Sequence, residues 1–320
     1  MGEGAEGATG VLRVGTYNLY LGADLLLLLG DRTGEELEAG REEVRRQLET
    51  TAFPRRVQAL ARLLARERLD LVGLQEVCEW RVDGTLLWDF AALLGEALEA
   101  AGEPYDVLVT DPTFTGSGTL LLDGAEVRLG LTGSNVVLRR RSSAVEVIDT
   151  DRGQFRQAMS VTALGEVGLE VARGWCAARC RLPAGREVVF VTTHTEAHDA
   201  ASRDVQREEL VAVLPPDDVP LVVVGDFNAT PAVVGMPPGL VDAWVAAGHP
   251  VDAPEGATSG QAADLRNPVS ALSQRIDYVW LRHGEVLECH RFGAAPEDRT
   301  EEGLWPSDHA GVAATLRLPR

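Results

Sequence analysis

Three features of the sequence predict a layered α/β protein. Residues 16–19 and 70–76 each predict a strand with polar side chains at its end, and an amphipathic helix lies between them. The order strand, helix, strand is typical of such folds. Residues 221–224 are apolar and mostly β-branched, which predicts a fully buried strand that Gly225 ends. A chain of 320 residues, 45% hydrophobic and 25% charged, is long enough and ordinary enough in composition to bury a sizeable core.

The N-terminal part predicts alternating strands and helices. Residues 10–15 lead into the first strand, which ends at Asn18, and residues 34–51 are predicted to be helical in part. Phe53-Pro54 begins a clear helix because proline suits a first helical turn. The apolar stripe of this helix consists of Val57, Leu60, Ala61 and Leu64. The next strand covers residues 70–76 and places Glu76 at its end.

The middle of the chain predicts one more helix and then mainly strands. The helix covers residues 88–101 and is closed by Gly102. Residues 111–134 carry no assignable pattern. Alternation typical of antiparallel sheet is visible in the later strands. The predicted strands cover residues 105–109, 136–139, 144–148, 159–163, 175–182 and 188–193.

The C-terminal part predicts a helix at residues 200–214 before the central strand at 221–224. Residues 230–267 are rich in proline and glycine and predict surface loops with short helices. Two strands, at residues 276–281 and 312–316, close the sheet, and each adjoins a polar motif. We expect residues 111–134 and 230–267 to form the loops that determine the substrate.

Asp226 and Asn228 follow the central strand, at the edge where open α/β sheets bind ligands. An acid and an amide two residues apart can act on one substrate group there, although a tight turn capped by both side chains is an alternative. Other polar motifs occur in a fixed order along the chain. The full set is Thr16-Tyr17-Asn18-Leu19, Leu74-Gln75-Glu76-Val77, Thr193-His194-Thr195-Glu196-Ala197, Gly225-Asp226-Phe227-Asn228, Arg275-Ile276-Asp277-Tyr278-Val279 and Ser307-Asp308-His309.

This ordered set resembles the endonuclease/exonuclease/phosphatase superfamily, whose fold is that of deoxyribonuclease I. The resemblance extends from residue 16 to residue 309. It implies an α/β (α+β) fold of four layers, an α/β/β/α sandwich with two packed mixed sheets. Because motifs at both ends of the chain belong to one site, we expect a flexible N-terminus at residues 1–10 and a single domain at residues 11–320.

A metal site is predicted around Glu76, because a charge at the end of a buried strand is costly unless it is paired or bound to metal. Mg²⁺ favours carboxylates, carbonyls and water, and Mn²⁺ is an alternative. Asn18 is expected as a neighbouring ligand or as a group that positions Glu76. The resemblance implies that Asp308 completes the metal environment. Whether one or two metal ions bind stays open.

His309 is the first candidate for proton transfer, because histidine titrates near neutrality. The resemblance implies that Asp277 orients its imidazole and stabilises the charged form. His309 would then activate or position the attacking water. Asp226 would orient or deprotonate the same water, so the choice of base between Asp226 and His309 stays open.

Two further residues are expected at the phosphoryl group. The resemblance implies that His194 donates hydrogen bonds to phosphoryl oxygens or helps to protonate the leaving group, and Asn228 would stabilise developing negative charge. His198 completes a His-x-x-x-His pattern with His194. We reject zinc there, because the pattern lacks an adjacent glutamate and a third ligand of matching spacing.

The sequence therefore predicts a Mg²⁺-dependent phosphoester hydrolase, acting on phosphodiesters by in-line attack of water. Nucleic acid, a lipid headgroup and a small phosphodiester all remain candidate substrates, as do endonuclease, exonuclease and phosphatase activities. The alternative is a non-catalytic binding protein that retains the fold. Such a protein should have lost some of the site residues, and all are present here. No protein partner is predicted, and the oligomeric state stays open.

The remaining features of the composition restrict the function less. A net charge of −19 argues against a broad basic surface for nucleic acid. The start of the sequence lacks the pattern of a secretory signal and no apolar run is long enough for a membrane span, so we expect a cytoplasmic protein, with a processed secreted form as the alternative. The four cysteines are expected to be reduced, and the leucines at residues 25–29 are expected to pack inward or to form a hydrophobic loop.

Overall fold

A computed structural model describes residues 10–29, 33–122, 125–162, 168–183 and 185–319. The predicted flexible segment at residues 1–10 lies outside the described residues except for Gly10. Within the described residues, strands assemble into two sheets, one of nine strands (sheet A) and one of six (sheet B).

Sheet A has the strand order β14-β15-β1-β2-β5-β4-β8-β7, and β3 pairs with β2 outside this path. Its strands are β1 (Val11–Asn18), β2 (Leu71–Val82), β3 (Thr85–Asp89), β4 (Tyr105–Leu122), β5 (Ala125–Arg140), β7 (Met159–Thr162), β8 (Gly168–Val171), β14 (Glu285–Phe292) and β15 (Gly311–Arg317). Strands β1 and β2 are parallel and the other pairs are antiparallel, so the sheet is mixed.

Sheet B has the order β12-β13-β11-β10-β9-β6. Its strands are β6 (Glu146–Gln154), β9 (Gly174–Arg181), β10 (Glu187–His194), β11 (Leu221–Asp226), β12 (Val241–Asp242) and β13 (Asp277–Arg282). Here β10 and β11 form the parallel pair. Three of the six strands, β10, β11 and β13, begin or end within a predicted polar motif.

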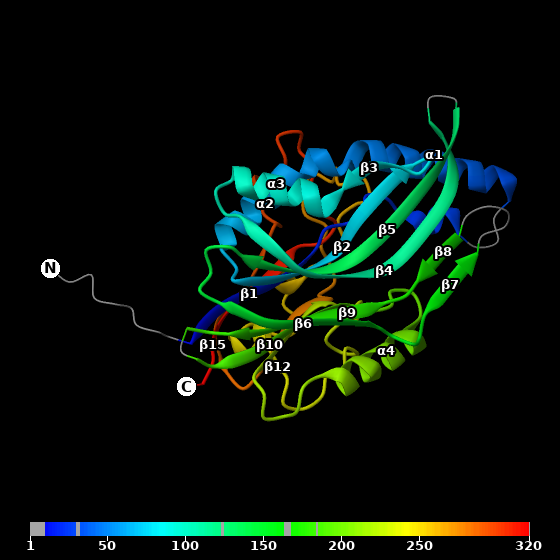
Figure 1. The fold of residues 1–320 in the computed structure, drawn as a ribbon. Helices are drawn as coiled ribbons and strands as arrows, with labels where there is room; N and C mark the ends of the chain where they lie inside the picture. Colours follow the sequence, from blue (N-terminus) through cyan, green and yellow to red (C-terminus); the bar gives the residue numbers. More distant parts are fainter. Residues whose placement is uncertain (1–9, 30–32, 123–124, 163–167, 184, 320) are drawn as a thin grey trace.

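Helices cover the outer faces of the two sheets (Figure 1). They are α1 (Gly34–Thr51), α2 (Phe53–Glu67) and α3 (Phe90–Ala100) over sheet A, and α4 (Ala200–Val213) over sheet B. The short helices are η1 (Leu25–Leu28), α5 (Ala243–Ala246), η2 (Pro254–Gly256) and η3 (Pro296–Asp298). The predicted α/β/β/α sandwich with two mixed sheets is thus confirmed.

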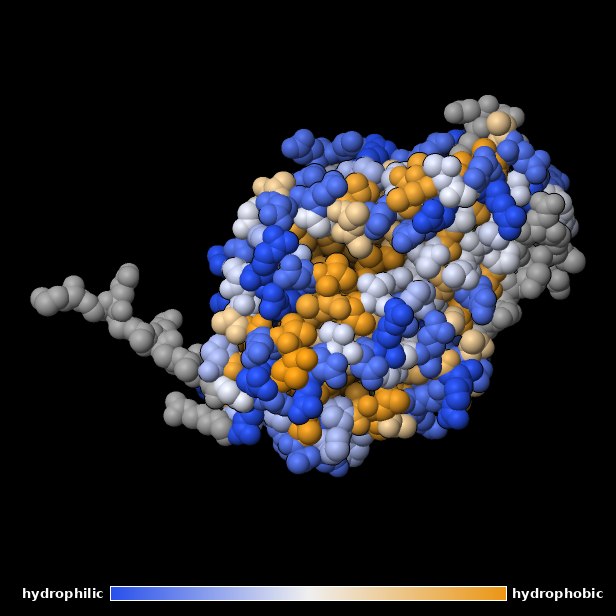
Figure 2. Space-filling model, viewed as in Figure 1, coloured by the Kyte–Doolittle hydropathy of each residue, from blue (hydrophilic) through white to orange (hydrophobic). Residues whose placement is uncertain are grey.

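The core lies in three layers, one between the sheets and one beneath each helical layer. Between the sheets, Val14 and Leu71 of sheet A pack in the same cluster as Phe190 and Val222 of sheet B. Gly73 permits the close approach, because a Cβ there would lie 2.3 Å from Thr192 Oγ1. Figure 2 shows hydrophobic side chains between the helical layer and the lower sheet, with hydrophilic side chains over much of the outer surface.

Several predicted boundaries are wrong. Residues 111–122 and 125–134 are not loops: they belong to the long strands β4 and β5, which pair with each other. β2 does not end at Glu76 but continues to Val82, and the predicted helix at residues 88–101 begins only at Phe90, because Trp88 and Asp89 belong to β3. Sequence periodicity also missed β3, β8, β12 and β14. The hairpin was hidden because its glycines and threonines interrupt apolar alternation.

All four cysteines are buried and free. Among the described helices, none combines the length and the apolar composition needed to cross a bilayer.

Candidate functional site

The register of the strands brings the predicted motifs to one end of the sandwich. His194 of β10 lies opposite Asp226 of β11, and Asp226 lies opposite Asp277 of β13. In sheet A, Asn18 at the end of β1 lies opposite Gln75 of β2. Two parallel pairs, one in each sheet, therefore direct their carboxyl ends toward the same region, as expected for ligand sites in α/β sheets.

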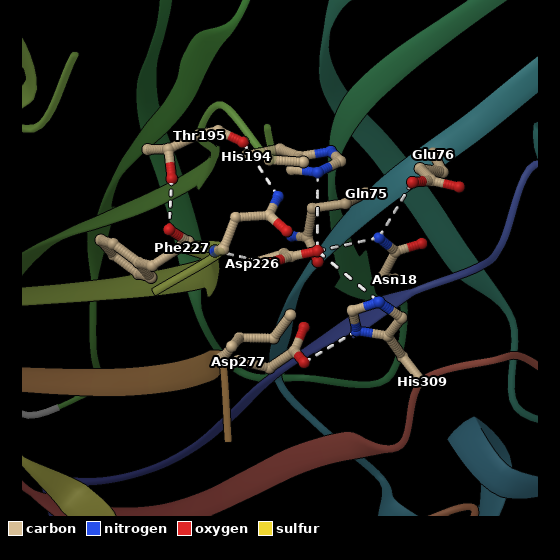
Figure 3. Close-up of polar contacts among 12 residues, drawn as sticks. Asn18, Gln75, Glu76, His194, Thr195, Asp226, Phe227, Asp277 and His309 are labelled. Atoms are coloured by element: carbon tan, nitrogen blue, oxygen red, sulfur yellow. Dashed lines mark hydrogen bonds and ion pairs between the residues drawn. The ribbon is translucent and has the colours of Figure 1, made fainter. Parts of the chain in front are cut away.

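Asp226 lies at the centre of this region and contacts side chains from both sheets (Figure 3). Its Oδ2 accepts a hydrogen bond from Asn18 Nδ2 at 3.1 Å and lies 3.5 Å from His194 Nε2 and 3.8 Å from His309 Nε2. Glycine is required at position 225, before Asp226, because its φ is +144° and a Cβ would lie 2.1 Å from Thr193 O. Burial, and then Asp277, raise the pKa of Asp226 to about 6.

His309 and Asp277 form a buried pair, with His309 Nδ1 2.8 Å from Asp277 Oδ2. Burial opposes the charged imidazole, but Asp277, Asp308 and Asp226 together raise the pKa of His309 well above its usual value. Ser307 orients the loop, because its Oγ donates to Asn18 O and accepts from the backbone N–H of His309. The pair therefore holds the imidazole of His309 in one orientation and favours its protonated form.

His194 has the opposite electrostatic environment. Burial, and then the positive charges of Arg173 and His309, lower its pKa well below the usual value. Arg173 Nη1 lies 3.0 Å from Nδ1 and 3.2 Å from Nε2 of this imidazole. A guanidinium only donates, so a hydrogen bond from Arg173 requires an unprotonated ring nitrogen, and this agrees with the lowered pKa in favouring a neutral His194.

Glu76 is directed into the cleft by a β-bulge. The pairing of β2 with β5 shifts between Leu74 and Val77, and Glu76 adopts a left-handed conformation with φ +53°. Its carboxylate accepts from Leu21 N at 2.7 Å and from Asn18 Nδ2 at 3.2 Å. Asn18 Oδ1 accepts from Tyr20 N, so the amide of Asn18 is fully engaged in positioning its neighbours.

Glu76 and Asp308 line the same cleft, and carboxylate oxygens are the ligands that a hard cation prefers. Burial raises the pKa of Asp308 to about 7, and Glu76 and Asp226 contribute to this shift against the attraction of His309 and Arg56. The guanidinium of Arg56 is already committed to backbone carbonyls, including Leu19 O and Pro306 O. A divalent ion bound by oxygen ligands would relieve this repulsion between like charges.

A second set of residues also has the spacing of a metal site. One ligand atom each from Asp226, Asp277 and His309 lie within 4.8 Å of one another. Asp277 Oδ1 is buried without a hydrogen-bond partner. In this set, however, Asp277 Oδ2 and His309 Nδ1 already form a hydrogen bond with each other, so these two atoms are not free to bind a metal ion.

Asn228 lies beside Asp226 and lines the same cleft. Its backbone adopts φ +46°, an uncommon conformation for a residue other than glycine. Its N–H donates to Asp226 Oδ1 at 2.9 Å, while its Nδ2 donates to Thr195 O at 3.0 Å. The structure thus brings all eight predicted residues to one end of the molecule, and most of them line one cleft of about 490 Å³.

Two buried arginines at the site were missed by sequence reasoning. Arg173 precedes β9 and lines the cleft, stacked against Phe114 at 5.9 Å from the ring centroid. Arg56 lies on α2 and joins the loop after β1 to the loop before His309. Neither arginine stands in a polar motif, so nothing local distinguishes them from exposed arginines.

Comparison with known proteins agrees with this geometry. A sequence profile of the endonuclease/exonuclease/phosphatase family matches residues 15–309. The chain belongs to this family. Proteins of the family are hydrolases of phosphoester bonds and generally depend on divalent metal ions. The predicted family resemblance is therefore confirmed.

Solved structures share the fold at low identity. A humanized TDP2 from D. rerio has a TM-score of 0.58 at 17% identity, with 97% of this chain and 100% of that chain covered. D. rerio TDP2 complexed with a single-strand DNA product has a TM-score of 0.58 at 17% identity, with coverages of 96% and 99%. The family protein from Beutenbergia cavernae has a TM-score of 0.57 at 22% identity, with coverages of 96% and 72%. A search of curated proteins finds no match.

Proposed function

We propose that this protein is a Mg²⁺-dependent phosphodiesterase that hydrolyses its substrate by in-line attack of water. The observation that carries the proposal is the convergence on Asp226 Oδ2 of Asn18, His194 and His309, from two sheets and a loop. Such a buried cluster of titratable groups with opposite pKa shifts is typical of catalytic sites.

Asp226 is the better candidate for the base. Its pKa of about 6 lets it be ionised at neutral pH and still accept a proton from water. His309 is held protonated by Asp277, so it serves as a hydrogen-bond donor that positions the water or the phosphoryl group. The water oxygen forms the new bond to phosphorus, the water proton passes to Asp226, and the bond from phosphorus to the leaving oxygen breaks.

The phosphoryl oxygens are bound by donors on the other side of the cleft. Neutral His194 donates a hydrogen bond, and Asn228 contributes its amide where negative charge develops. Arg173 adds a buried positive charge next to His194. Glu76 and Asp308 would hold the Mg²⁺ ion, with Asn18 positioning Glu76. When bound, that ion supplies charge neutralisation at the phosphate and the leaving oxygen.

The proposal is tested by hydrolysis of bis(4-nitrophenyl) phosphate, plasmid DNA and a phosphocholine lipid, each with Mg²⁺ or EDTA. His309→Ala should lose the Mg²⁺-dependent activity of the wild type. His290→Ala is the matched control, because His290 also pairs with a carboxylate, Glu67, at 2.8 Å but lies outside the cleft. Full activity in His309→Ala would contradict the mechanism. If no substrate is hydrolysed, the binding-protein alternative gains support.

A further inference from the structure

One wall of the catalytic cleft is apolar. Leu25 and Leu26 of η1 and Leu29 after it line the cleft beside Glu76 and His194, together with Phe114 and Leu169 from sheet A. The side chain of Leu26 is exposed, with a relative accessibility of 43%. The five-leucine run was expected to pack inward or to form a hydrophobic loop. In the structure Leu28 is buried, whereas Leu25, Leu26 and Leu29 line the cleft.

The apolar wall continues beyond the catalytic residues into a narrow slot of about 40 Å³. Leu25, Leu29 and Leu169 line both the cleft and the slot, so the two cavities adjoin each other along these side chains. The slot is completed by Trp80, by Leu131 and by glycines of the β4–β5 hairpin. An apolar surface that adjoins a catalytic site is typical of a ligand-binding pocket.

The charges of the cleft disfavour a polynucleotide. The described residues that line it include one arginine, Arg173, and no lysine. They also include five acids, Asp24, Glu76, Glu196, Asp226 and Asp308. Nucleic-acid sites neutralise several phosphates with basic side chains, and the chain as a whole has a net charge of −19. One phosphate next to Arg173, with an apolar group along the leucines, matches the cleft better.

We propose that the apolar wall formed by Leu25, Leu26, Leu29 and Leu169 binds the alkyl chain of an amphiphilic phosphodiester. The inference rests on the proposed phosphodiesterase function and names the substrate class of the same site. The phosphate of the substrate lies among the catalytic residues, and its alkyl chain runs along the leucines toward the slot beside Trp80. Burying the chain removes apolar surface of both substrate and protein from water, which provides the binding free energy.

The test is a series of alkyl 4-nitrophenyl phosphates, with methyl, butyl and hexyl groups, assayed with Mg²⁺ below their aggregation concentrations. For wild type, kcat/KM should rise about two- to fourfold for each methylene that is buried. Leu26→Asp should flatten this dependence. Leu87→Asp is the matched control, because Leu87 is 46% exposed on β3 and lies outside the cleft. It should retain the wild-type dependence on chain length.

A flat chain-length dependence in the wild type, or an equal slope in Leu26→Asp, would overturn the inference. Preferential hydrolysis of thymidine 5′-(4-nitrophenyl phosphate), unaffected by Leu26→Asp, would also overturn it and favour a nucleic-acid substrate. Comparison of a dispersed short-chain phospholipid with vesicles of phosphatidylcholine distinguishes a free amphiphile from a bilayer as the source of the chain.

If even the methyl ester stays intact, the proposed function fails, and the inference is then judged by binding alone. Isothermal titration calorimetry should show that hexyl phosphate binds wild type at least about tenfold more tightly than methyl phosphate does. The difference should shrink in Leu26→Asp. Equal affinities of the wild type for the two phosphates would refute the apolar site independently of catalysis.

Discussion

Replacement of Asp277 by asparagine tests the electrostatic design of the site most directly. Asp277 Oδ2 lies 2.8 Å from His309 Nδ1, and after burial it is the largest influence on the pKa of His309, which it raises. Asparagine preserves the shape but removes the charge. The imidazolium then loses its nearest stabilising partner, while Asp226 and Asp308 still favour it. The pKa of His309 should therefore fall in Asp277→Asn.

The expected loss follows from the role of the pair. Loss of one hydrogen-bond donor at a catalytic site costs about 10²- to 10³-fold in rate, so kcat/KM at neutral pH should fall by about that factor, or roughly 3–4 kcal/mol of transition-state stabilisation. The high-pH limit of activity should also move to lower pH, because a less basic His309 loses its proton earlier. The assay is the pH profile of kcat/KM for bis(4-nitrophenyl) phosphate with saturating Mg²⁺.

Glu67→Gln is the matched control, because Glu67 pairs with His290 at the same distance of 2.8 Å away from the cleft. It should leave both the rate and the pH profile unchanged. Circular dichroism and thermal melting must show that each variant is folded. A folded Asp277→Asn that keeps kcat/KM within about threefold of wild type would refute the role assigned to this pair.

Three other predictions follow from the structure. Arg173→Gln should lower kcat/KM about 10²-fold, because the buried charge next to His194 stabilises the phosphoryl oxygens, and Arg173→Lys should lower it less. Arg179→Gln, at an exposed position, is the control in the same kinetic assay. The pKa values of Asp308 (about 7) and Asp226 (about 6) are raised, so protonation of these groups stabilises the metal-free fold at low pH, and this stabilisation is lost as the pH rises from about 4 to 7. Protons and Mg²⁺ compete for Asp308, so Mg²⁺ should raise Tm more at about pH 8 than at about pH 5.5. Gly73→Ala should cost about 1–3 kcal/mol in urea unfolding because its Cβ meets Thr192, whereas Gly95→Ala, in an open position on α3, should be stabilising.

Each of these has a contradicting outcome. Equal losses of kcat/KM in Arg173→Gln and Arg179→Gln would show that only the net charge of the protein matters, and not the position of Arg173. A Tm shift with Mg²⁺ that is the same at both pH values would contradict competition between protons and metal at Asp308. Unchanged stability of Gly73→Ala would show that the sheets can separate at no cost.

Much of the fold was determined by local sequence. The apolar run at residues 221–224 specifies a strand buried on both faces, and the stripe on residues 53–64 specifies a helix against a sheet. Polar residues that end neighbouring parallel strands lie at the same end of a sheet, as His194 and Asp226 do. Asn18 belongs to the other sheet, and only the family resemblance assigned it to the same site. These inferences succeed because strand and helix periodicity are properties of neighbouring residues.

Only the tertiary structure decided how the side chains meet. Asn18 and Asp226 are separated by 208 residues, and their hydrogen bond exists because sheet A packs on sheet B at the distance that Gly73 permits. The bulge at Glu76, the charge of Arg173 beside His194 and the turn of Leu26 toward the cleft depend on strands and loops distant in sequence. Local pattern specifies each element, whereas pKa values, cleft shape and apolar lining arise from contacts between elements.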